Sequence, residues 1–405
     1  MFTPGECIPV DELRDRYTRC RTLLTRHIPN AGGVLVIGTP NIYYMTGTQA
    51  NGLLWLPHKG KPVLAVRKGL ERAAMESPLQ AIVPFRSYRE LPSLFEKAGS
   101  PLSPVIGVDQ AGVGWEQGRM LTERLRECAF VPADAVIAKT RAIKSLWELE
   151  KMRESGRRLA IGLRELAEDI RPGMNERAIS HALWIRFFAL GHAGPAPTGM
   201  HGSTVFLGHI VAGENGNYPS AYDGPLGVKG EHPAAPSMGH AQSVWKRGQI
   251  LAIDTGFNFE GYLSDRTQLY FAGKESAIPT NVRKAQDTAI RIAEKASKEL
   301  RPGAIPAKIY QLCLELAQKA GFDEGFMGIG SDKVRFIGHG IGLTVSEWPV
   351  FARSITAPLQ EGMVVALEPK ISLPGIGMVG VEDTWEITDT GAKCLTGNDS
   401  TIICV

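Results

Sequence analysis

The sequence predicts an α/β protein of two domains, and three observations support that prediction. The chain has 405 residues, which at roughly 150 residues per domain is enough for two or perhaps three cores. Short β-like runs alternate with amphipathic stretches from Val10 to about Ala138. Beyond that region the pattern changes to long helical stretches and separate strand-like runs. We therefore expect a small N-terminal domain over 1–140 and a larger domain over 141–405.

The first region contains three apolar runs of strand length, GGVLVIG at 32–38, PVLAVRKG at 62–69 and PVIGVD at 104–109. A charged, leucine-containing segment from Lys139 to Lys151 then opens a helix, which we expect to run to about Asp169. The boundary between the domains is expected near Arg141, at the start of this helix.

A helix-breaking tripeptide occurs twice in the second region. Arg171-Pro172-Gly173 ends the first long helix, because proline disfavours helical backbone in the residue before it and glycine accepts positive φ. A second helical stretch, Ile278 to Leu300, ends at Arg301-Pro302-Gly303, 130 residues later. This spacing suits two related halves of one domain, although three shared residues can also be coincidence. Strand-like segments cover 249–257, 262–271, 363–368 and 380–387.

Composition excludes several classes of protein. With 43% hydrophobic and 21% charged residues the chain falls in the ordinary globular range. Lys and Arg number 45 against 42 Asp and Glu, without a long basic run, so we expect no nucleic-acid partner. The six cysteines are scattered with no CxxC pair, and we find neither a secretory signal nor a membrane-spanning stretch. A cytoplasmic protein with no membrane contact is expected.

Acidic residues interrupt apolar strands at four places. Asp254 and Asp265 lie eleven residues apart, and the glycines between them favour two arms of a β-hairpin. Glu368 and Glu382 each follow a strongly apolar run. A buried carboxylate without a partner costs several kcal/mol or shifts its pKa, so these four acids need counter-charge.

Divalent cations meet that need, since no matching set of four arginines or lysines is evident on neighbouring apolar strands. Two metals about 3.5–4 Å apart can share bridging carboxylates and lower the pKa of a shared water. His339, between glycines after an apolar run, is the expected fifth ligand. Each residue alone has an ordinary structural explanation, but their joint occurrence favours a two-metal site.

These residues carry a resemblance to a known family. The segments D254-T-G-F-N-F-E-G-Y-L-S-D265, G338-H339-G340, E368-P and V-E382-D-T resemble the pita-bread metallopeptidases, which include aminopeptidase P, prolidase, methionine aminopeptidase and creatinase. Upstream, N41-I-Y-Y-M-T-G47 and the segment from Arg141 to Glu150 resemble the creatinase-type N-terminal domain and its linker helix. The resemblance implies a small α/β creatinase-like domain followed by a pseudo-two-fold pita-bread catalytic domain.

The resemblance also implies a role for each ligand. Asp254 would chelate one metal, His339 and Glu368 would bind the other, and Asp265 with Glu382 would bridge the two. Glu368 would also accept a proton from the attacking water. Manganese is the first expectation for the two divalent ions, and iron, cobalt or zinc also suit four oxygens and one nitrogen. A homodimer is expected from the family as well.

The family pattern is broken at three positions. Ser346 and Ser220 stand where peptidase members usually have active-site histidines, and Gln268 stands where an arginine is usual. Serine cannot carry positive charge near neutral pH, so it replaces such a histidine poorly. These three positions and Tyr222 are candidate substrate-binding residues. The residues that could take over the missing function are His201, His209, His240 and Tyr222.

The leading functional hypothesis is a dinuclear metal-dependent hydrolase of the Xaa-Pro peptidase type, cleaving an amide C–N bond with a metal-bridging hydroxide. An alternative is a related enzyme acting on a non-peptide small molecule, as creatinase, ectoine hydrolase and dimethylsulfoniopropionate lyase do; the two serines favour it. A third reading is a catalytically silent binding protein, although such proteins usually lose ligands and all five are present here.

Overall fold

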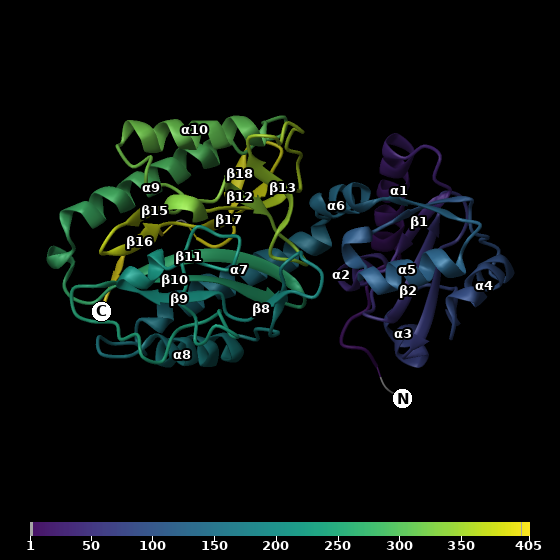
Figure 1. The fold of residues 1–405 in the computed structure, drawn as a ribbon, viewed down its shortest axis with the longest axis horizontal. Helices are drawn as coiled ribbons and strands as arrows, with labels where there is room; N and C mark the ends of the chain where they lie inside the picture. Colours follow the sequence, from purple (N-terminus) through teal and green to yellow (C-terminus); the bar gives the residue numbers. More distant parts are fainter. Residues whose placement is uncertain (1–2, 398) are drawn as a thin grey trace. The chain divides into compact units, whose positions relative to one another are not determined.

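The computed structural model describes residues 3–397 and 399–405. The chain divides into two compact units (Figure 1). The N-terminal unit comprises the residues up to Arg141 together with 200–203, and the C-terminal unit comprises 142–199 and 204–405. The predicted mixed α/β class is confirmed. Within the described ranges, every helix is too short or too polar to cross a bilayer.

The N-terminal unit is built on a mixed sheet with strand order β4-β3-β2-β1-β5-β6. Strand β1 pairs with β2 antiparallel and with β5 parallel, which places it near the centre. The three runs expected to form strands are confirmed as β1, β3 and β5. The strands are β1 (Gly33–Val36), β2 (Asn51–Pro57), β3 (Val63–Lys68), β4 (Ile82–Pro84), β5 (Val105–Val108) and β6 (Ala129–Pro132).

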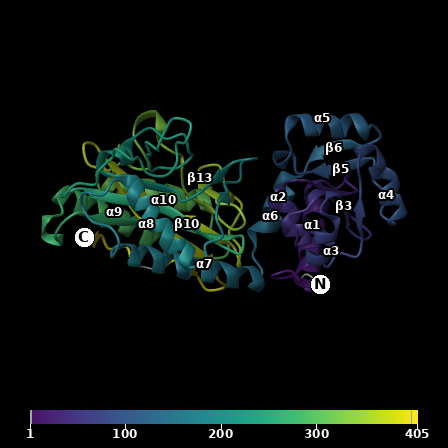
Figure 2. The same ribbon diagram turned by 90° about the horizontal axis from the view of Figure 1, so that it is seen from below.

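Both faces of this sheet are buried, which explains why its strands are apolar almost without interruption. Leu35 and Trp55 share a cluster with Phe95 and Leu121, so helices α4 and α5 cover that face. Leu54, on the opposite face, is equally buried. Figure 2 shows α5 beside β6. The helices of this unit are α1 (Val10–His27), α2 (Thr39–Thr46), α3 (Leu70–Glu76), α4 (Leu91–Lys97), α5 (Trp115–Arg124) and α6 (Asp134–Ala142).

The helix predicted from Lys139 to Asp169 is interrupted, and that prediction was wrong in this respect. Helix α6 ends at Ala142, and α7 begins at Leu146 and runs to Leu166. The cause is a capping box, in which the Ser145 side chain accepts from the Glu148 backbone N–H and the Glu148 carboxylate accepts from the Ser145 N–H. These bonds start a new helix and preclude a continuous one.

The C-terminal unit contains the expected repeat of a helix, an Arg-Pro-Gly breaker and a second helix. Helix α7 precedes Gly173 and α8 (Glu176–Ala189), and α9 (Thr280–Lys298) precedes Gly303 and α10 (Pro306–Lys319). Both glycines have positive φ, +100° and +85°, and each donates its N–H to a distant backbone carbonyl. Pair α7/α8 packs on β9, β10 and β11, and pair α9/α10 packs on β12 to β16, with the strands between the pairs (Figure 1).

The strands of this unit form two main sheets, β19-β11-β10-β9 and β13-β12-β14-β17-β18. Strands β15 and β16 form a separate antiparallel pair, as do β7 and β8. The predicted strands at 249–257, 262–271, 363–368 and 380–387 are confirmed as β10, β11, β14 and the β16–β17 region. The strands are β7 (Ala196–Pro197), β8 (Thr204–Val205), β9 (His209–Ala212), β10 (Ile250–Phe259), β11 (Tyr262–Phe271), β12 (Phe336–Gly340), β13 (Glu347–Ala352), β14 (Val364–Leu367), β15 (Lys370–Leu373), β16 (Gly377–Gly380), β17 (Asp383–Ile387), β18 (Ala392–Cys394) and β19 (Ile403–Cys404).

Asp109, at the end of β5, is a buried carboxyl group that organises the N-terminal unit. Its oxygens accept from the backbone N–H groups of Ile37 and Gly38, each at 2.8 Å, and from the Asn41 side chain at 3.1 Å. These bonds join β5 to the chain between β1 and α2. Burial raises the pKa of Asp109 to about 6 despite the three donors, because removing a carboxylate from water disfavours its charge.

The pKa of Asp109 predicts a pH-dependent stability. The folded value of about 6 exceeds the ordinary value of 3.8, so the folded protein holds this proton more tightly. The resulting stabilisation is present below pH 3.8 and is lost as pH rises through about 6. Asp109→Asn cannot titrate there. The unfolding free energy of wild type relative to this variant should fall by on the order of 2–3 kcal/mol between about pH 4 and pH 7.

Urea unfolding followed by circular dichroism at several pH values measures this difference. The matched control is Asp11→Asn, an aspartate of α1 whose side chain is 76% exposed, and it should leave the pH profile of the wild type unchanged. A wild-type stability that rises relative to Asp109→Asn over the same interval would contradict the assignment.

Candidate metal centre

A long β-hairpin brings the two aspartates together, as the sequence predicted. Strands β10 and β11 pair antiparallel, with Asp254 opposite Thr267 and Gly256 opposite Asp265. Side chains two residues apart on a strand share a face, so Asp254 and Asp265 lie diagonally on one face of the hairpin. The turn uses Glu260 and Gly261, both with positive φ, which is typical of two-residue hairpin loops.

The other three predicted ligands come from the second main sheet. His339 lies on β12, Glu368 directly follows β14, and Glu382 directly precedes β17. Strand β14 pairs with both β12 and β17, which gathers the three residues at one end of the sheet. A backbone bridge between Thr267 and Glu382 joins this sheet to the hairpin.

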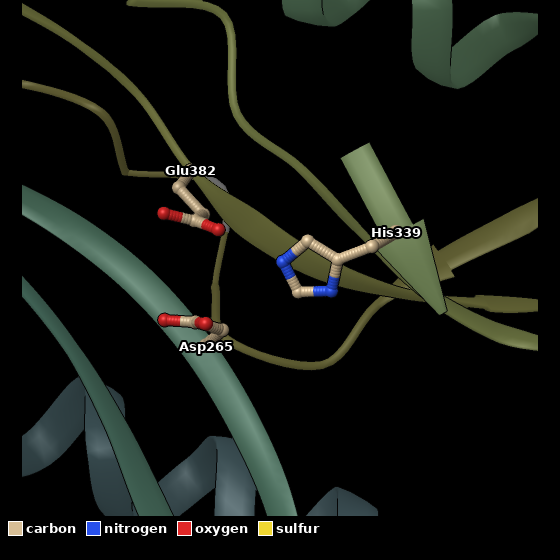
Figure 3. Close-up of side chains that lie close together, drawn as sticks. All are labelled: Asp265, His339 and Glu382. Atoms are coloured by element: carbon tan, nitrogen blue, oxygen red, sulfur yellow. The ribbon is translucent and has the colours of Figure 1, made fainter. Parts of the chain in front are cut away.

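Figure 3 shows Asp265, His339 and Glu382 directed toward a common space. One ligand atom from each of these three residues lies within 4.8 Å of the others, and so does one from each of Asp254, Glu368 and Glu382. We call these two sets the histidine group and the carboxylate group. Asp265, His339, Glu368 and Glu382 are buried, and the Asp254 side chain is 18% exposed.

The two carboxyl groups of the histidine group are buried close to other acids. Burial and the negative charge of Asp254 raise the pKa of Asp265 well above its ordinary range, and burial with Asp265 does the same to the pKa of Glu382. Among the described residues, no lysine or arginine forms an ion pair with Asp265. The His339 Nδ1 lies 3.0 Å from the Gly340 carbonyl, which can only accept, so Nδ1 is the hydrogen-bond donor in this contact and, in the neutral ring, Nε2 carries the lone pair. This is the form that binds a metal.

A lysine occupies the carboxylate group. Lys370 is fully buried, and its ammonium lies 3.1 Å from Asp254 Oδ2, 2.9 Å from Glu368 Oε2 and 2.7 Å from Glu382 Oε2. Burial alone would lower the pKa of Lys370, but these three carboxylates outweigh it and raise the pKa well above the ordinary range. Burial likewise acts to raise the pKa of Asp254, yet Lys370, His209 and the hydrogen bond with Glu382 together outweigh it, and the net shift is downward.

The prediction from the sequence missed Lys370, because it required a matching set of four basic residues and did not consider a single lysine shared by three acids. The signal was present in the order Glu368-Pro369-Lys370, because side chains at i and i+2 of an extended segment share a face. What could not be foreseen is that β15 would direct this face toward Asp254, which is more than a hundred residues earlier.

His209 is the additional histidine that the fold brings close to the ligands. It lies on β9 opposite Asp254 and is buried, with its ring 5.0 Å from that of Tyr222. Burial lowers the pKa of His209, the nearby Lys370 lowers it further, and Asp254 partly opposes both. The ring is therefore neutral near pH 7 and can act as an acceptor or donor but not as a cation.

Ser220 and Tyr222 line a small pocket together with Ser372 of β15. The Ser220 hydroxyl accepts from the Tyr222 backbone N–H at 3.0 Å, which gives this loop a tight turn. Ser372 is two residues after Lys370 on β15, so the pocket borders the strand that carries the lysine. Ser220 and Tyr222 therefore stay candidates for contact with a bound molecule.

Four other candidates lie outside the ligand cluster. Gln268 is out of phase with Asp265 on β11, and its amide donates to the Leu269 and Thr401 carbonyls. Ser346 is exposed and its backbone bonds to Thr198. The other two are His201, which is exposed, and His240, whose ring accepts from the Gln242 backbone N–H.

Comparison with known proteins agrees with this architecture. Residues 150–389 match the model of "Metallopeptidase family M24", and residues 16–143 match that of the "Creatinase/Prolidase N-terminal domain". Xaa-Pro dipeptidases of Pyrococcus furiosus and Pyrococcus horikoshii are each 23% identical to the chain, and each comparison covers 91% of this chain and 94% of the relative.

Solved structures with the same fold include the Xaa-Pro dipeptidase from Bacillus anthracis, with a TM-score of 0.81 at 20% identity over 97% of this chain and 100% of that one. The prolidase from Pyrococcus horikoshii OT3 has a TM-score of 0.78 at 23% identity over 96% and 100%. These likenesses confirm the pita-bread fold and the creatinase-like N-terminal domain. With the family model covering most of its length, the chain belongs to metallopeptidase family M24, a family of metal-dependent hydrolases.

Proposed function

We propose that this protein hydrolyses an amide C–N bond in small peptide-like substrates, with Xaa-Pro peptides as the reference class. The observation that carries the proposal is the histidine group, Asp265, His339 and Glu382, buried at the junction of two sheets, where no basic side chain of the described residues forms an ion pair with Asp265. The printed names of the relatives, Xaa-Pro dipeptidases, support the choice of substrate class.

The donor set of the histidine group fits a divalent ion. Two carboxylates and an imidazole suit manganese, iron, cobalt or zinc, and manganese is our first choice. When bound, such an ion polarises a carbonyl and lowers the pKa of water. The raised pKa values of Asp265 and Glu382 describe the protein without this charge, and metal binding would displace their protons.

Glu368 is positioned to accept a proton during the reaction. One of its oxygens lies 3.7 Å from His339 Nε2, and the other accepts from the Lys370 ammonium at 2.9 Å. The lysine therefore holds the carboxylate in one orientation and leaves the other oxygen directed toward the histidine group. A general base needs this kind of fixed position within hydrogen-bond reach of the proton it removes.

A second candidate function is hydrolysis of a C–N bond in a non-peptide small molecule. Ser220 and Ser346 replace two histidines of the peptidase pattern, and Lys370 adds a cation to the ligand cluster. His209, opposite Asp254 on the neighbouring strand, is a group that can donate or accept a proton in their place. The silent binding protein remains a third reading, which metal-dependent turnover of any substrate would exclude.

Two further expectations are part of the proposal. The protein is proposed to act in the cytoplasm, in keeping with free thiols at all six cysteines. It is also proposed to form a homodimer, an expectation that rests on family resemblance.

Activity on Xaa-Pro substrates tests the proposed function. A panel of Xaa-Pro dipeptides and tripeptides with added Mn²⁺ should include substrates cleaved at ordinary enzymic rates, about 1–10³ s⁻¹. A chelator should abolish that cleavage because the ion supplies the polarising charge. The measurement is release of the cleaved products with time. No cleavage across the panel would favour the non-peptide alternative.

Asp265→Ala tests the metal site itself. Removing a ligand of the histidine group should weaken metal binding by more than about 100-fold and abolish turnover. Elemental analysis after dialysis measures the bound metal. Asp287→Ala, an exposed aspartate on α9, is the matched control and should keep full metal content. Full occupancy in Asp265→Ala would overturn the assignment of this ligand.

Glu368→Gln tests the proposed proton acceptor. The amide cannot take up a proton, so kcat should fall by about 10²–10⁴-fold. Metal at the histidine group should persist, because Asp265, His339 and Glu382 are unchanged. Steady-state kinetics and metal analysis separate the two effects, with the exposed Glu361→Gln as control. A variant with unchanged kcat would exclude Glu368 as the general base.

A further inference from the structure

The ammonium of Lys370 stands where the carboxylate group would hold a cation. Its distances to Asp254, Glu368 and Glu382 are 3.1, 2.9 and 2.7 Å, those of hydrogen-bonded ion pairs. The same three residues are those whose oxygens lie within 4.8 Å of one another. A metal ion in this group would need those oxygens at about 2.0–2.2 Å. The ammonium and a metal ion therefore compete for one space.

The fold holds Lys370 in this position. Strand β15 pairs with β16, where Lys370 is opposite Gly380, and the Lys370 carbonyl accepts from the Met327 backbone N–H at 2.9 Å. Gly380 has a φ of +151°, and a Cβ there would lie 2.6 Å from Lys370 Cα and 3.0 Å from its Cγ. A glycine opposite the lysine thus leaves the space that the lysine side chain needs.

The two groups are compensated unequally. Lys370 pairs with every member of the carboxylate group, whereas among the described residues no basic side chain pairs with Asp265 of the histidine group. A protonated lysine supplies a single positive charge and donates hydrogen bonds. Unlike a metal ion, it cannot accept a lone pair from a water or substrate oxygen. The histidine group offers the imidazole of His339 and the carboxylate of Asp265, together with Glu382, which it shares with Lys370.

We propose that this protein binds one divalent ion per chain, at the histidine group, and that Lys370 takes the place of the second. The inference rests on the proposed metal-dependent function and replaces its dinuclear form. Substrate polarisation then falls to a single ion, with Glu368 held by the lysine. Asp254, a metal chelator in the expectation from family resemblance, becomes a partner of Lys370.

Metal stoichiometry tests this proposal with Mn²⁺ alone as the probe. Purified full-length protein is stripped with chelator, titrated with Mn²⁺, and examined by native mass spectrometry and elemental analysis. Wild type should bind one Mn²⁺ per chain. Lys370→Met keeps most of the aliphatic side chain, removes the charge, and should bind two. Lys308→Met, an exposed lysine on α10, should stay at one.

Electron paramagnetic resonance of the Mn²⁺-loaded wild type gives a second readout that needs no variant. An isolated ion gives a six-line spectrum, and a pair sharing bridging carboxylates gives a spin-coupled one. Two bound ions or a coupled spectrum in wild type would overturn the proposal, as would failure of wild type to bind any. A folded Lys370→Met protein that still binds one ion would overturn it too.

These outcomes are separable from the proposed substrate class, because no substrate is present. One bound Mn²⁺ without cleavage of any Xaa-Pro peptide would support the single-ion site and contradict the peptidase assignment. Two bound Mn²⁺ with normal cleavage of an Xaa-Pro peptide would contradict the single-ion site and support the peptidase assignment.

Discussion

The structure depends on the cost of burying like charges together. Asp254, Asp265, Glu368 and Glu382 converge on one small region, and three of them are less than a tenth exposed. Carboxylates this close repel one another and lose hydration, and the raised pKa values of Asp265 and Glu382 express both penalties. Only cations or bound protons can relieve them. In the C-terminal unit the strands place the Lys370 ammonium against three of these four acids.

The scaffold that holds the acids is rigid and apolar. The β10–β11 hairpin supplies two of them, and the ends of β14 and β17 supply the others. Direct bonds tie the two sheets together: the Thr267 hydroxyl donates to Glu382 at 3.0 Å, and the Thr384 hydroxyl accepts from the Asp265 N–H at 2.8 Å. Ligands on paired strands keep their separation better than ligands on loops, which favours a fixed charge pattern before any ion binds.

Lys370 supplies positive charge to the acids from within the protein. The lysine satisfies three carboxylates at once, and burial of the group costs less because each charge has a partner at hydrogen-bond distance. Ser220 and Ser346 stand where the family pattern has histidines, and of these two only Ser220 lines the pocket that includes Ser372. The changes together point to a cluster whose charge is distributed differently from that expected of two metal ions.

The sequence by itself determined the elements and the ligand types. Apolar runs marked β1, β3, β5, β10 and β11, and acids at strand positions marked the candidate metal ligands, because burial and charge leave a local pattern. The break at Ser145 was missed because a capping box outweighed the helical periodicity around it. Only the tertiary structure decided that Lys370 lies among these acids and Gln268 does not. Which face of a strand meets which neighbour depends on the pairing of distant segments, and this pairing is a property of the whole fold.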